Sequence, residues 1–225
     1  MIVVKRGKEP NSLLKFRKEN PNADYETDMP TDVLKDIREQ MWKEQSRLCA
    51  YCMKKINEPS VVRIEHCRPR HPQDEKEHDR KATLDFKWML GVCYGNSLLR
   101  GVKPEDKTCD AHRGNTELTI NPFDEVSVRK IKYKTDGSIY SDDVEINKDV
   151  TETLNLNCHT LSLPQTRKNV LLAVQDRITK KCKGKSQDAF MHELERIYAS
   201  LVQERNLTPY CGIIISWLEN KLKIS

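Results

Sequence analysis

The chain has 225 residues, which suffices for one large domain or for one small domain with an extension. Apolar residues make up 37% and charged residues 32%, and Leu, Ile and Val are frequent enough that we expect a folded core rather than wholesale disorder. The net charge of +5 permits a nucleic-acid partner, but an ordinary basic soluble protein fits that charge equally well.

No apolar segment has the length of a signal-peptide core or of a bilayer span. We therefore expect a cytoplasmic protein with no membrane partner. In that reducing compartment, eight cysteines do not favour a disulfide framework. Metal ligation is the better explanation wherever the cysteines occur in spaced sets.

Residues 1–48 are predicted to form an N-terminal arm and a leading helix. Residues 1–20 carry six Lys or Arg against two Glu, a balance of +4. A solvated tail explains this charge better than a contact with a phosphate backbone, because no aromatic or base-reading pattern accompanies it. The helix is expected to start at Thr31, whose hydroxyl can cap it. Apolar residues then recur at helical spacing: Leu34, Ile37, Met41 and Leu48.

Cys49 and Cys52 follow this helix directly, and thiolates three positions apart can take two corners of a zinc tetrahedron. Cys93 and Cys109 are predicted to supply the other two corners, since the glycines between them allow that segment to loop out and return. One alternative is a single buried cysteine pair with unrelated thiols. Another is ligation by Cys67, although its place in a strand suggests that it points away from His66.

Glu65 and His66 lie between the two cysteine pairs. Residues 61–66 alternate as in a strand, and we expect a short hairpin over residues 49–66, followed by an irregular loop over residues 68–87. A carboxylate beside an imidazole places a ligand for a hard cation next to a general base. In isolation such a pair is usually an ordinary surface feature, but its place between cysteine pairs favours catalysis.

The rest of the chain is predicted to be a second hairpin followed by helices. Strands are expected over residues 126–133 and 138–146, with a turn at Gly137. Helices are expected over residues 150–157, 161–183, 186–205 and 209–222, with a break at Gly184. The cations near the end of the second of these helices are better explained by its dipole than by phosphate binding.

The stretch from Cys49 to Asn115 resembles the HNH (ββα-metal) endonucleases. Their pattern runs from Cys-x-x-Cys through Asp-His or Glu-His with a nearby proline to a second cysteine pair that opens a helix. Over residues 48–177 the likeness is greatest to the PtuB-type nucleases of Septu and retron-associated anti-phage systems. The matching pieces are Ile64-Glu65-His66-Cys67-Arg68-Pro69, Met89-Leu90-Gly91-Val92-Cys93, Cys109-Asp110 through Asn115, Leu118 through Pro122, and Leu154 through Asn157.

This resemblance implies an α+β fold with a zinc-clamped ββα-metal core. The core and its added hairpin would occupy residues 49–147, and a helical region would follow over residues 148–225. Cys49, Cys52, Cys93 and Cys109 would bind a structural Zn²⁺. The family usually has an Asn a few residues before the third cysteine, where this chain has Trp88. What supports the loop that carries the histidine is therefore left open.

Carried over by position, His66 is expected to be the general base and Glu65 a ligand of a catalytic Mg²⁺ or Mn²⁺. The third ligand should come from the helix that Cys109 opens. There we favour His112 over Asp110, which can instead cap the helix. Three arginines are candidates for phosphate contacts, with surface solvation as the equal alternative: Arg68, Arg70 and Arg113.

The expected function is metal-dependent hydrolysis of nucleic-acid phosphodiester bonds, with DNA favoured over RNA. The resemblance also implies an ABC-like ATPase of PtuA type as partner and, in retron systems, a reverse transcriptase with its DNA–RNA product. The absence of a Gly-rich phosphate loop in this chain agrees with a separate ATPase. The alternative is a non-catalytic, zinc-stabilised nucleic-acid-binding or adaptor subunit.

Overall fold

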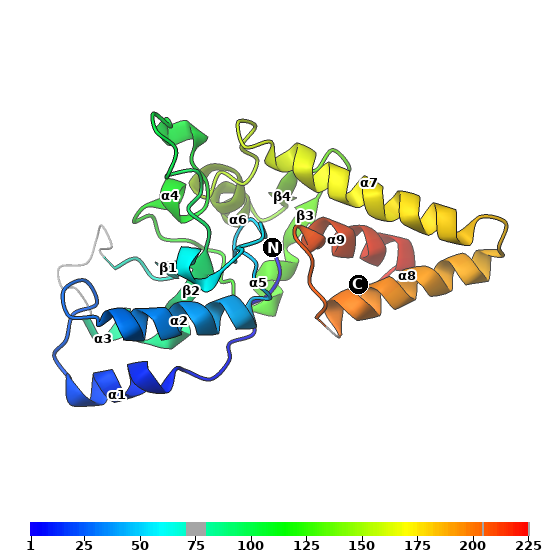
Figure 1. Cartoon of the computed structure of the whole chain (residues 1–225). Coiled ribbons are helices and arrows are strands. Elements are labelled where there is room, and N and C mark those ends of the chain that lie inside the picture. Colours follow the sequence, from blue (N-terminus) through cyan, green and yellow to red (C-terminus); the bar gives the residue numbers. More distant parts are fainter. Residues whose placement is uncertain (71–79, 204, 225) are drawn as a thin grey trace.

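In the computed structural model, which describes residues 1–70, 80–203 and 205–224, helices surround two small antiparallel sheets (Figure 1). This mixture agrees with the predicted α+β class. The described helices are α1 (Asn11–Glu19), α2 (Thr31–Glu44), α3 (Arg80–Thr83), α4 (Asp110–Arg113), α5 (Glu125–Arg129), α6 (Val144–Lys148), α7 (Leu163–Cys182), α8 (Gln187–Val202) and α9 (Cys211–Leu222). The described strands are β1 (Arg63–His66), β2 (Met89–Val92), β3 (Ile131–Tyr133) and β4 (Ile139–Ser141).

The first sheet pairs β1 with β2, in a register that places His66 opposite Met89. The predicted strand over residues 61–66 is confirmed as β1. The prediction that it forms a hairpin with the chain from residue 49 is wrong, because β1 pairs with β2. The segment directly after α2 closes on itself through an isolated antiparallel bridge between Leu48 and Lys55. Alternation along a sequence identifies a strand but not its partner, which here lies more than twenty residues away.

The side chain of Gln45, directly after α2, binds the free edge of β2 as a neighbouring strand would. The Gln45 side chain donates to the Gly91 carbonyl at 2.6 Å and accepts from the Gly91 N–H at 2.8 Å. A Cβ on Gly91 would lie 3.1–3.3 Å from Val62, Gln45 and Met41. This close approach of a helix to the strand explains the glycine and leaves all four residues of β2 buried.

The loop expected over residues 68–87 lies partly outside the described residues, at 71–79. Its described end contains α3 and a 3₁₀ turn over Phe86–Trp88. The Asp85 side chain caps that turn by accepting from the Lys87 N–H at 3.0 Å. Short capped turns of this kind leave no periodic pattern, so the sequence indicated only an irregular segment.

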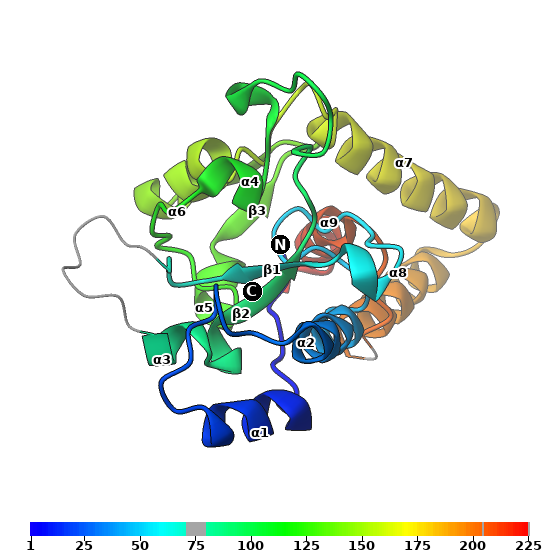
Figure 2. The same ribbon diagram turned by 60° about the vertical axis from the view of Figure 1, so that its left-hand side comes forward.

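The expected solvated tail at residues 1–20 is wrong. Val4 is buried and its N–H donates to the Pro122 carbonyl at 2.9 Å, while α1 packs on α2. Figures 1 and 2 both show α1 and α2 on one side of β1 and β2, with α4 on the other side. The expected cap is also wrong, because Pro30 precedes the first helical residue and no side chain caps α2.

Arg6 explains how a charged segment enters the core. Its guanidinium carbon lies 4.3 Å from the centroid of the Phe86 ring and 4.6 Å from that of Phe123. The same group pairs with the Glu44 carboxylate and donates to the Met89 carbonyl. Stacking and pairing offset much of the cost of burying this guanidinium, although its Nε has no acceptor among the described residues. A count of charges along the chain does not reveal such contacts.

The second sheet confirms the predicted hairpin, with shorter strands than expected over 126–133 and 138–146. β3 pairs with β4, and Gly137 in the turn has a φ of 91°. The outer ends of both expected strands form α5 and α6 instead. Asp124 and Asp143 start these helices by accepting hydrogen bonds from backbone N–H groups of the first turn.

The C-terminal helices α7, α8 and α9 confirm the helices predicted over 161–183, 186–205 and 209–222, within a few residues at their ends. Gly184, at a φ of 74°, separates α7 from α8 as expected. In place of the short helix expected over 150–157, the chain forms a π-helical turn over Asp149–Thr153. The three long helices share a hydrophobic cluster with Leu48 and Met53, so they pack against the segment that carries the first two cysteines.

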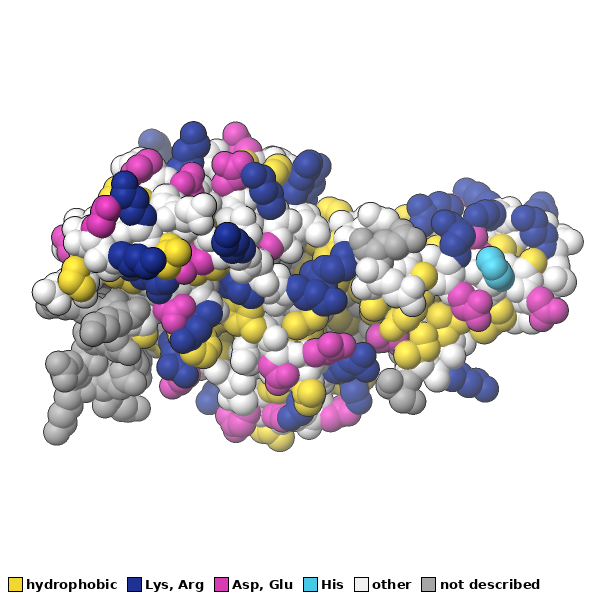
Figure 3. All heavy atoms as spheres, turned by 90° about the horizontal axis from the view of Figure 1, so that it is seen from below, with side chains coloured by type: hydrophobic (Ala, Val, Ile, Leu, Met, Phe, Trp, Pro, Cys, Tyr) yellow, Lys and Arg dark blue, Asp and Glu magenta, His cyan; other side chains and the backbone are white. Residues whose placement is uncertain are grey.

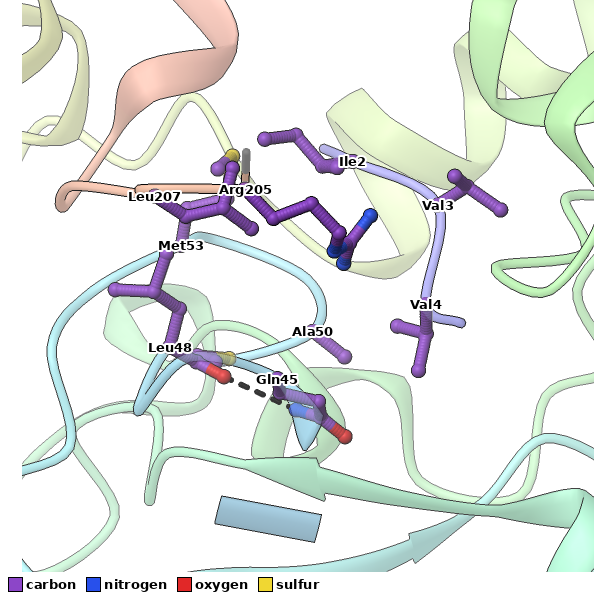
Figure 4. A pocket seen from close by; sticks show the side chains of 10 residues that line it. Ile2, Val3, Val4, Gln45, Leu48, Ala50, Met53, Arg205 and Leu207 are labelled. Carbon is purple, nitrogen blue, oxygen red and sulfur yellow. Dashed lines mark hydrogen bonds between the residues drawn. The ribbon is translucent and has the colours of Figure 1, made fainter. Parts of the chain in front are cut away.

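A narrow cavity lies between the first cysteine loop, over residues 48–53, and the N-terminal segment (Figure 4). Figure 4 shows residues of the N-terminal segment facing the cysteine loop across it, with Arg205 and Leu207 closing one end. The dashed contact in Figure 4 is the hydrogen bond of 3.0 Å from the Gln45 side chain to the Leu48 carbonyl. The first residues of the chain therefore help to cover the cysteine loop.

On the face seen in Figure 3, acidic and basic side chains are mixed, and Lys and Arg gather over the far end of the α7–α8 hairpin. Two of the lysines in this region form ion pairs, Lys180 with Asp176 and Lys181 with Glu193. Within the described part of the chain, no helix combines the length and apolarity that a bilayer crossing requires.

Replacing Arg6 with Ala should lower the free energy of unfolding by about 3 kcal/mol, because the buried Glu44 carboxylate loses its partner. Urea denaturation followed by circular dichroism measures this change. Lys8→Ala is the control, since Lys8 is exposed and should change stability by less than about 0.5 kcal/mol. If both substitutions had equally small effects on stability, the result would support a solvated tail at residues 1–20 instead.

Candidate functional site

Four cysteines from three segments of the chain converge on one point. The Sγ atoms of Cys49, Cys52, Cys93 and Cys109 all lie within 4.8 Å of one another. Three of the Sγ–Sγ separations are 3.7, 3.8 and 3.9 Å. A tetrahedron with Zn–S bonds of about 2.3 Å has edges of about 3.8 Å, so this set can hold a metal ion such as zinc.

The first two cysteines belong to a tight loop directly after α2. The Cys49 N–H donates to the Lys54 carbonyl at 2.9 Å, and the Met53 N–H donates to the Cys49 carbonyl at 3.0 Å. The Lys54 N–H points at the Cys52 sulfur at 3.5 Å. These bonds aim both thiols at the same point and supply a backbone donor to one of them.

The long segment between Cys93 and Cys109 forms a loop that is closed at Gly95. This agrees with the prediction that its glycines allow the segment to loop out and return. The Thr108 N–H donates to the Gly95 carbonyl at 3.0 Å, which closes the loop. Gly95 has a φ of 51°, and a Cβ there would lie 1.9 Å from the Thr108 carbonyl oxygen. Only glycine fits this approach without a backbone shift. The Cys109 N–H then donates to the Leu154 carbonyl at 2.9 Å.

Cys67, the alternative ligand, lies outside this group of sulfurs. Burial raises the pKa of its thiol to about 12, so it stays protonated at neutral pH. Its N–H donates to the Trp88 carbonyl at 2.8 Å and extends the β1–β2 pairing by one residue. Cys67 therefore acts as part of the sheet rather than as a ligand.

Glu65 lies at the centre of a buried polar group that joins β1, α4 and the first cysteine loop. Tyr51 lies between Cys49 and Cys52 in that loop. Its hydroxyl donates to Glu65 Oε1 at 3.0 Å. Arg113, from α4, forms an ion pair with the same oxygen. Burial raises the pKa of the Glu65 carboxyl to about 8, Arg113 opposes the rise, and the neighbouring Asp110 carboxylate adds to it.

The sequence suggested that Arg113 contacts phosphate or is solvated at the surface. In the structure Arg113 is an interior residue. Its guanidinium donates to the His66 and Cys67 carbonyls at 2.8 Å each, and its Nε donates to the Thr116 carbonyl at 2.7 Å. Only 3% of the residue is exposed. Arg113 therefore fixes the short helix α4 against β1.

His66 is buried at the end of β1 with one ring nitrogen occupied. Its Nε2 lies 2.9 Å from the Thr83 carbonyl oxygen, and the Tyr25 ring meets it edge-on at a centroid distance of 4.5 Å. A carbonyl only accepts hydrogen bonds, so Nε2 carries the proton and Nδ1 keeps its lone pair. Burial lowers the pKa of His66 to about 4, so the ring is neutral at pH 7.

The helix α4 directs Asp110, and not His112, toward Glu65 and His66. Asp110 lines the same small pocket as those two residues and forms an ion pair with Arg63. His112 is not among the lining residues, and its Nδ1 lies 3.0 Å from the Thr153 carbonyl oxygen. Two positions along a helix differ by roughly 200° around its axis, so these side chains leave on opposite faces. The preference for His112 as the third metal ligand is therefore reversed in favour of Asp110.

The pocket is about 60 Å³ and takes in residues from β1, from the chain just after it and from α4: Arg63, Ile64, Glu65, His66, Pro69, Arg70, Asp110, Arg113, Gly114 and Asn115. Two neighbouring carboxylates resist ionising together unless a cation joins them. Mg²⁺ commonly uses one or two carboxylates and completes its shell with water and substrate phosphate. Glu65 and Asp110 fit such a cation, although among the described residues only the cysteines form a set of three or more ligands.

The structure also answers what supports the histidine loop where Trp88 replaces the expected Asn. The Thr83 carbonyl holds the His66 ring, and the Trp88 carbonyl holds the Cys67 N–H. Both supports are backbone groups, which no residue type signals. The two supporting tyrosines, Tyr25 and Tyr51, were also missed by sequence reasoning, and only the place of Tyr51 between two cysteines pointed to it.

The remaining candidates for phosphate contacts differ from each other. The Arg68 side chain is exposed and stacks on Trp88, with its guanidinium carbon 4.0 Å from the ring centroid. Arg70 lines the pocket and pairs with Glu26 at 2.5 Å. Arg68 itself does not line the pocket, although its neighbours Pro69 and Arg70 do.

A comparison of the chain with protein-family models found no match, and a comparison with curated proteins found none either.

Purified protein should contain about one zinc per chain, bound by the four cysteines. Cys49→Ser should remove most of this zinc and lower the thermal midpoint by more than 10 °C, because ligation and folding are coupled. Elemental analysis and calorimetry measure the two effects. Cys182→Ser is the control, since Cys182 lies outside the group and should keep the zinc. A stable wild-type chain without metal would contradict the assignment.

Proposed function

We propose that the chain is a metal-dependent endonuclease of the HNH (ββα-metal) type that hydrolyses phosphodiester bonds. DNA is the favoured substrate, and RNA offers the same chemistry. The observation that carries the proposal is the convergence of a neutral His66, with Nδ1 free of the Thr83 bond, and two carboxylates in one small pocket. A general base beside a cation site is what hydrolysis of a phosphodiester needs.

In this proposal His66 Nδ1 accepts a proton from the attacking water. The Thr83 carbonyl keeps the ring in the required tautomer and orientation, and burial keeps the ring neutral. Glu65 and Asp110 would hold a Mg²⁺ or Mn²⁺ ion, which supplies charge stabilisation for the phosphate and the leaving oxygen. Tyr51 and Arg113 orient the Glu65 carboxylate from behind.

Cation binding would rearrange the ion pairs of the pocket. Arg63 neutralises Asp110, and 42% of its side chain is exposed, so it can turn away toward solvent or substrate. Arg113 is held by three backbone carbonyls as well as by Glu65 and would stay in place. A cation that binds Glu65 also has to displace the proton that its raised pKa favours below pH 8.

The biological setting follows from the resemblance to PtuB-type nucleases. We propose an effector of anti-phage defence that works with a separate ABC-like ATPase and, in a retron setting, with a reverse transcriptase and its DNA–RNA product. The chain itself has no Gly-x-x-x-x-Gly-Lys-Ser/Thr phosphate loop. This feature supports a division of labour in which nucleotide hydrolysis belongs to the partner.

The second candidate is a non-catalytic, zinc-stabilised nucleic-acid-binding or adaptor subunit. The zinc group supports it as well as it supports the nuclease. A binding module, however, has no use for a buried neutral histidine next to two carboxylates, which are costly to bury. This pocket therefore favours the enzyme.

His66→Ala should lower the cleavage rate of DNA in Mg²⁺ or Mn²⁺ by about 10²- to 10⁴-fold, the usual contribution of a general base. His112→Ala is the matched control and should stay within a few-fold of wild type, because His112 faces Thr153 instead of the pocket. Gel assays on DNA and RNA, with and without the ATPase, measure both. Loss of activity in His112→Ala with full activity in His66→Ala would overturn the assignment of the base.

A further inference from the structure

The exposed Arg68, two residues after His66, stacks on the half-buried Trp88, and the proposed chemistry does not use this pair. The guanidinium carbon of Arg68 lies 4.0 Å from the centre of the Trp88 ring, and the Lys87 ammonium lies 5.4 Å from the same ring. Lys87 is neutralised by Asp85 at 2.7 Å. Within the described part of the chain, Arg68 has no carboxylate partner, and the residue is exposed.

The position of this stack is fixed by the sheet. The Trp88 carbonyl accepts from the Cys67 N–H at 2.8 Å, directly beyond the last register pair of His66 and Met89. Arg68 follows His66 by two residues and precedes Arg70 by two, and both of those neighbours line the pocket.

Other aromatic and cationic groups continue the pattern around His66. The Tyr25 ring meets the imidazole edge-on, and the Arg70 guanidinium carbon lies 5.3 Å from the centre of the Tyr25 ring. Aromatic rings that alternate with arginines at a proposed phosphodiester site are typical of surfaces that hold unstacked bases and their phosphates together.

A second tryptophan stack in the same chain shows what a merely structural pair looks like. The Arg47 guanidinium carbon lies 4.6 Å from the centre of the Trp42 ring, and Arg47 is exposed like Arg68. Trp42, however, is held in place by its indole N–H, which donates to the Ile56 carbonyl at 2.8 Å. Among the described residues, no acceptor binds the indole N–H of Trp88 in this way.

We propose that the Arg68–Trp88 stack receives an unpaired nucleobase next to the bond that is cut at His66. The base lies on the outer face of the Arg68 guanidinium, whose inner face is fixed by Trp88. In a duplex both faces of each base are covered by its neighbours, so a base can reach this stack only from a single-stranded or locally unpaired segment. This inference rests on the proposed nuclease and names its substrate as nucleic acid with an unpaired base at the site.

The test measures binding in a His66→Ala background, in which the proposed cleavage is slowed by at least about 10²-fold. Fluorescence anisotropy compares three labelled 20-nucleotide DNA probes: a single strand, its duplex, and the single strand with abasic residues. The expected result is tighter binding of the intact single strand than of the other two. Arg68→Ala should weaken that binding by about tenfold, since one stacked base contributes about 1–3 kcal/mol, and should change duplex binding by less than twofold.

Arg68→Lys separates stacking from charge, because it keeps the charge and loses the plane. It should weaken single-strand binding as much as Arg68→Ala does, and Arg47→Ala, the matched control, should leave it unchanged. Recovery in Arg68→Lys, or equal losses on all three probes, would overturn the proposal in favour of a plain phosphate contact. Cleavage by the wild type, scored separately, tells the two proposals apart. Base-dependent binding without cleavage refutes the nuclease alone, and cleavage without base dependence refutes the stack alone.

Discussion

The structure depends on the convergence of four thiols from three parts of the chain. Cys49 and Cys52 follow α2, Cys93 follows β2, and Cys109 precedes α4, yet their sulfurs all lie within 4.8 Å of one another. A structural zinc contributes on the order of 10–16 kcal/mol in small zinc domains, as much as the whole stability of a typical domain. Ligation at this point would therefore decide whether α2, the first sheet and α4 stay together.

The consequence is clearest for α4, which has only four residues and would not be stable alone. Cys109 fixes its start, and Arg113 fixes its end through the carbonyls of His66 and Cys67. With both ends held, Asp110 is placed beside Glu65. The same burial that lowers the pKa of His66 raises that of Glu65, so a neutral imidazole and a carboxyl with a raised pKa arise from one desolvated pocket.

Much of this could be predicted from the sequence, because the spacing of cysteines and the sharp turn residues are local signals. The grouping of the four cysteines, Gly95 and Gly137 as turning points, and the three long C-terminal helices all follow from such signals. Contacts between distant residues were not predictable. The partner of β1, the stacking of Arg6 between two phenylalanines, and the burial of Arg113 each depend on tertiary packing. The side on which Asp110 and His112 lie was also not predictable: Asp110 lines the pocket with Glu65 and His66, whereas His112 faces the Thr153 carbonyl.

The central claim is that a zinc-bound group of cysteines holds Asp110 beside Glu65 to form a second cation site next to His66. The most direct measurement is a crystal structure of the chain soaked with Mn²⁺, with anomalous data collected at the zinc and manganese edges. The account predicts zinc at about 2.3 Å from the sulfurs of Cys49, Cys52, Cys93 and Cys109 and manganese between the carboxylates of Glu65 and Asp110. Manganese at His112, or zinc bound away from the four cysteines, would contradict it.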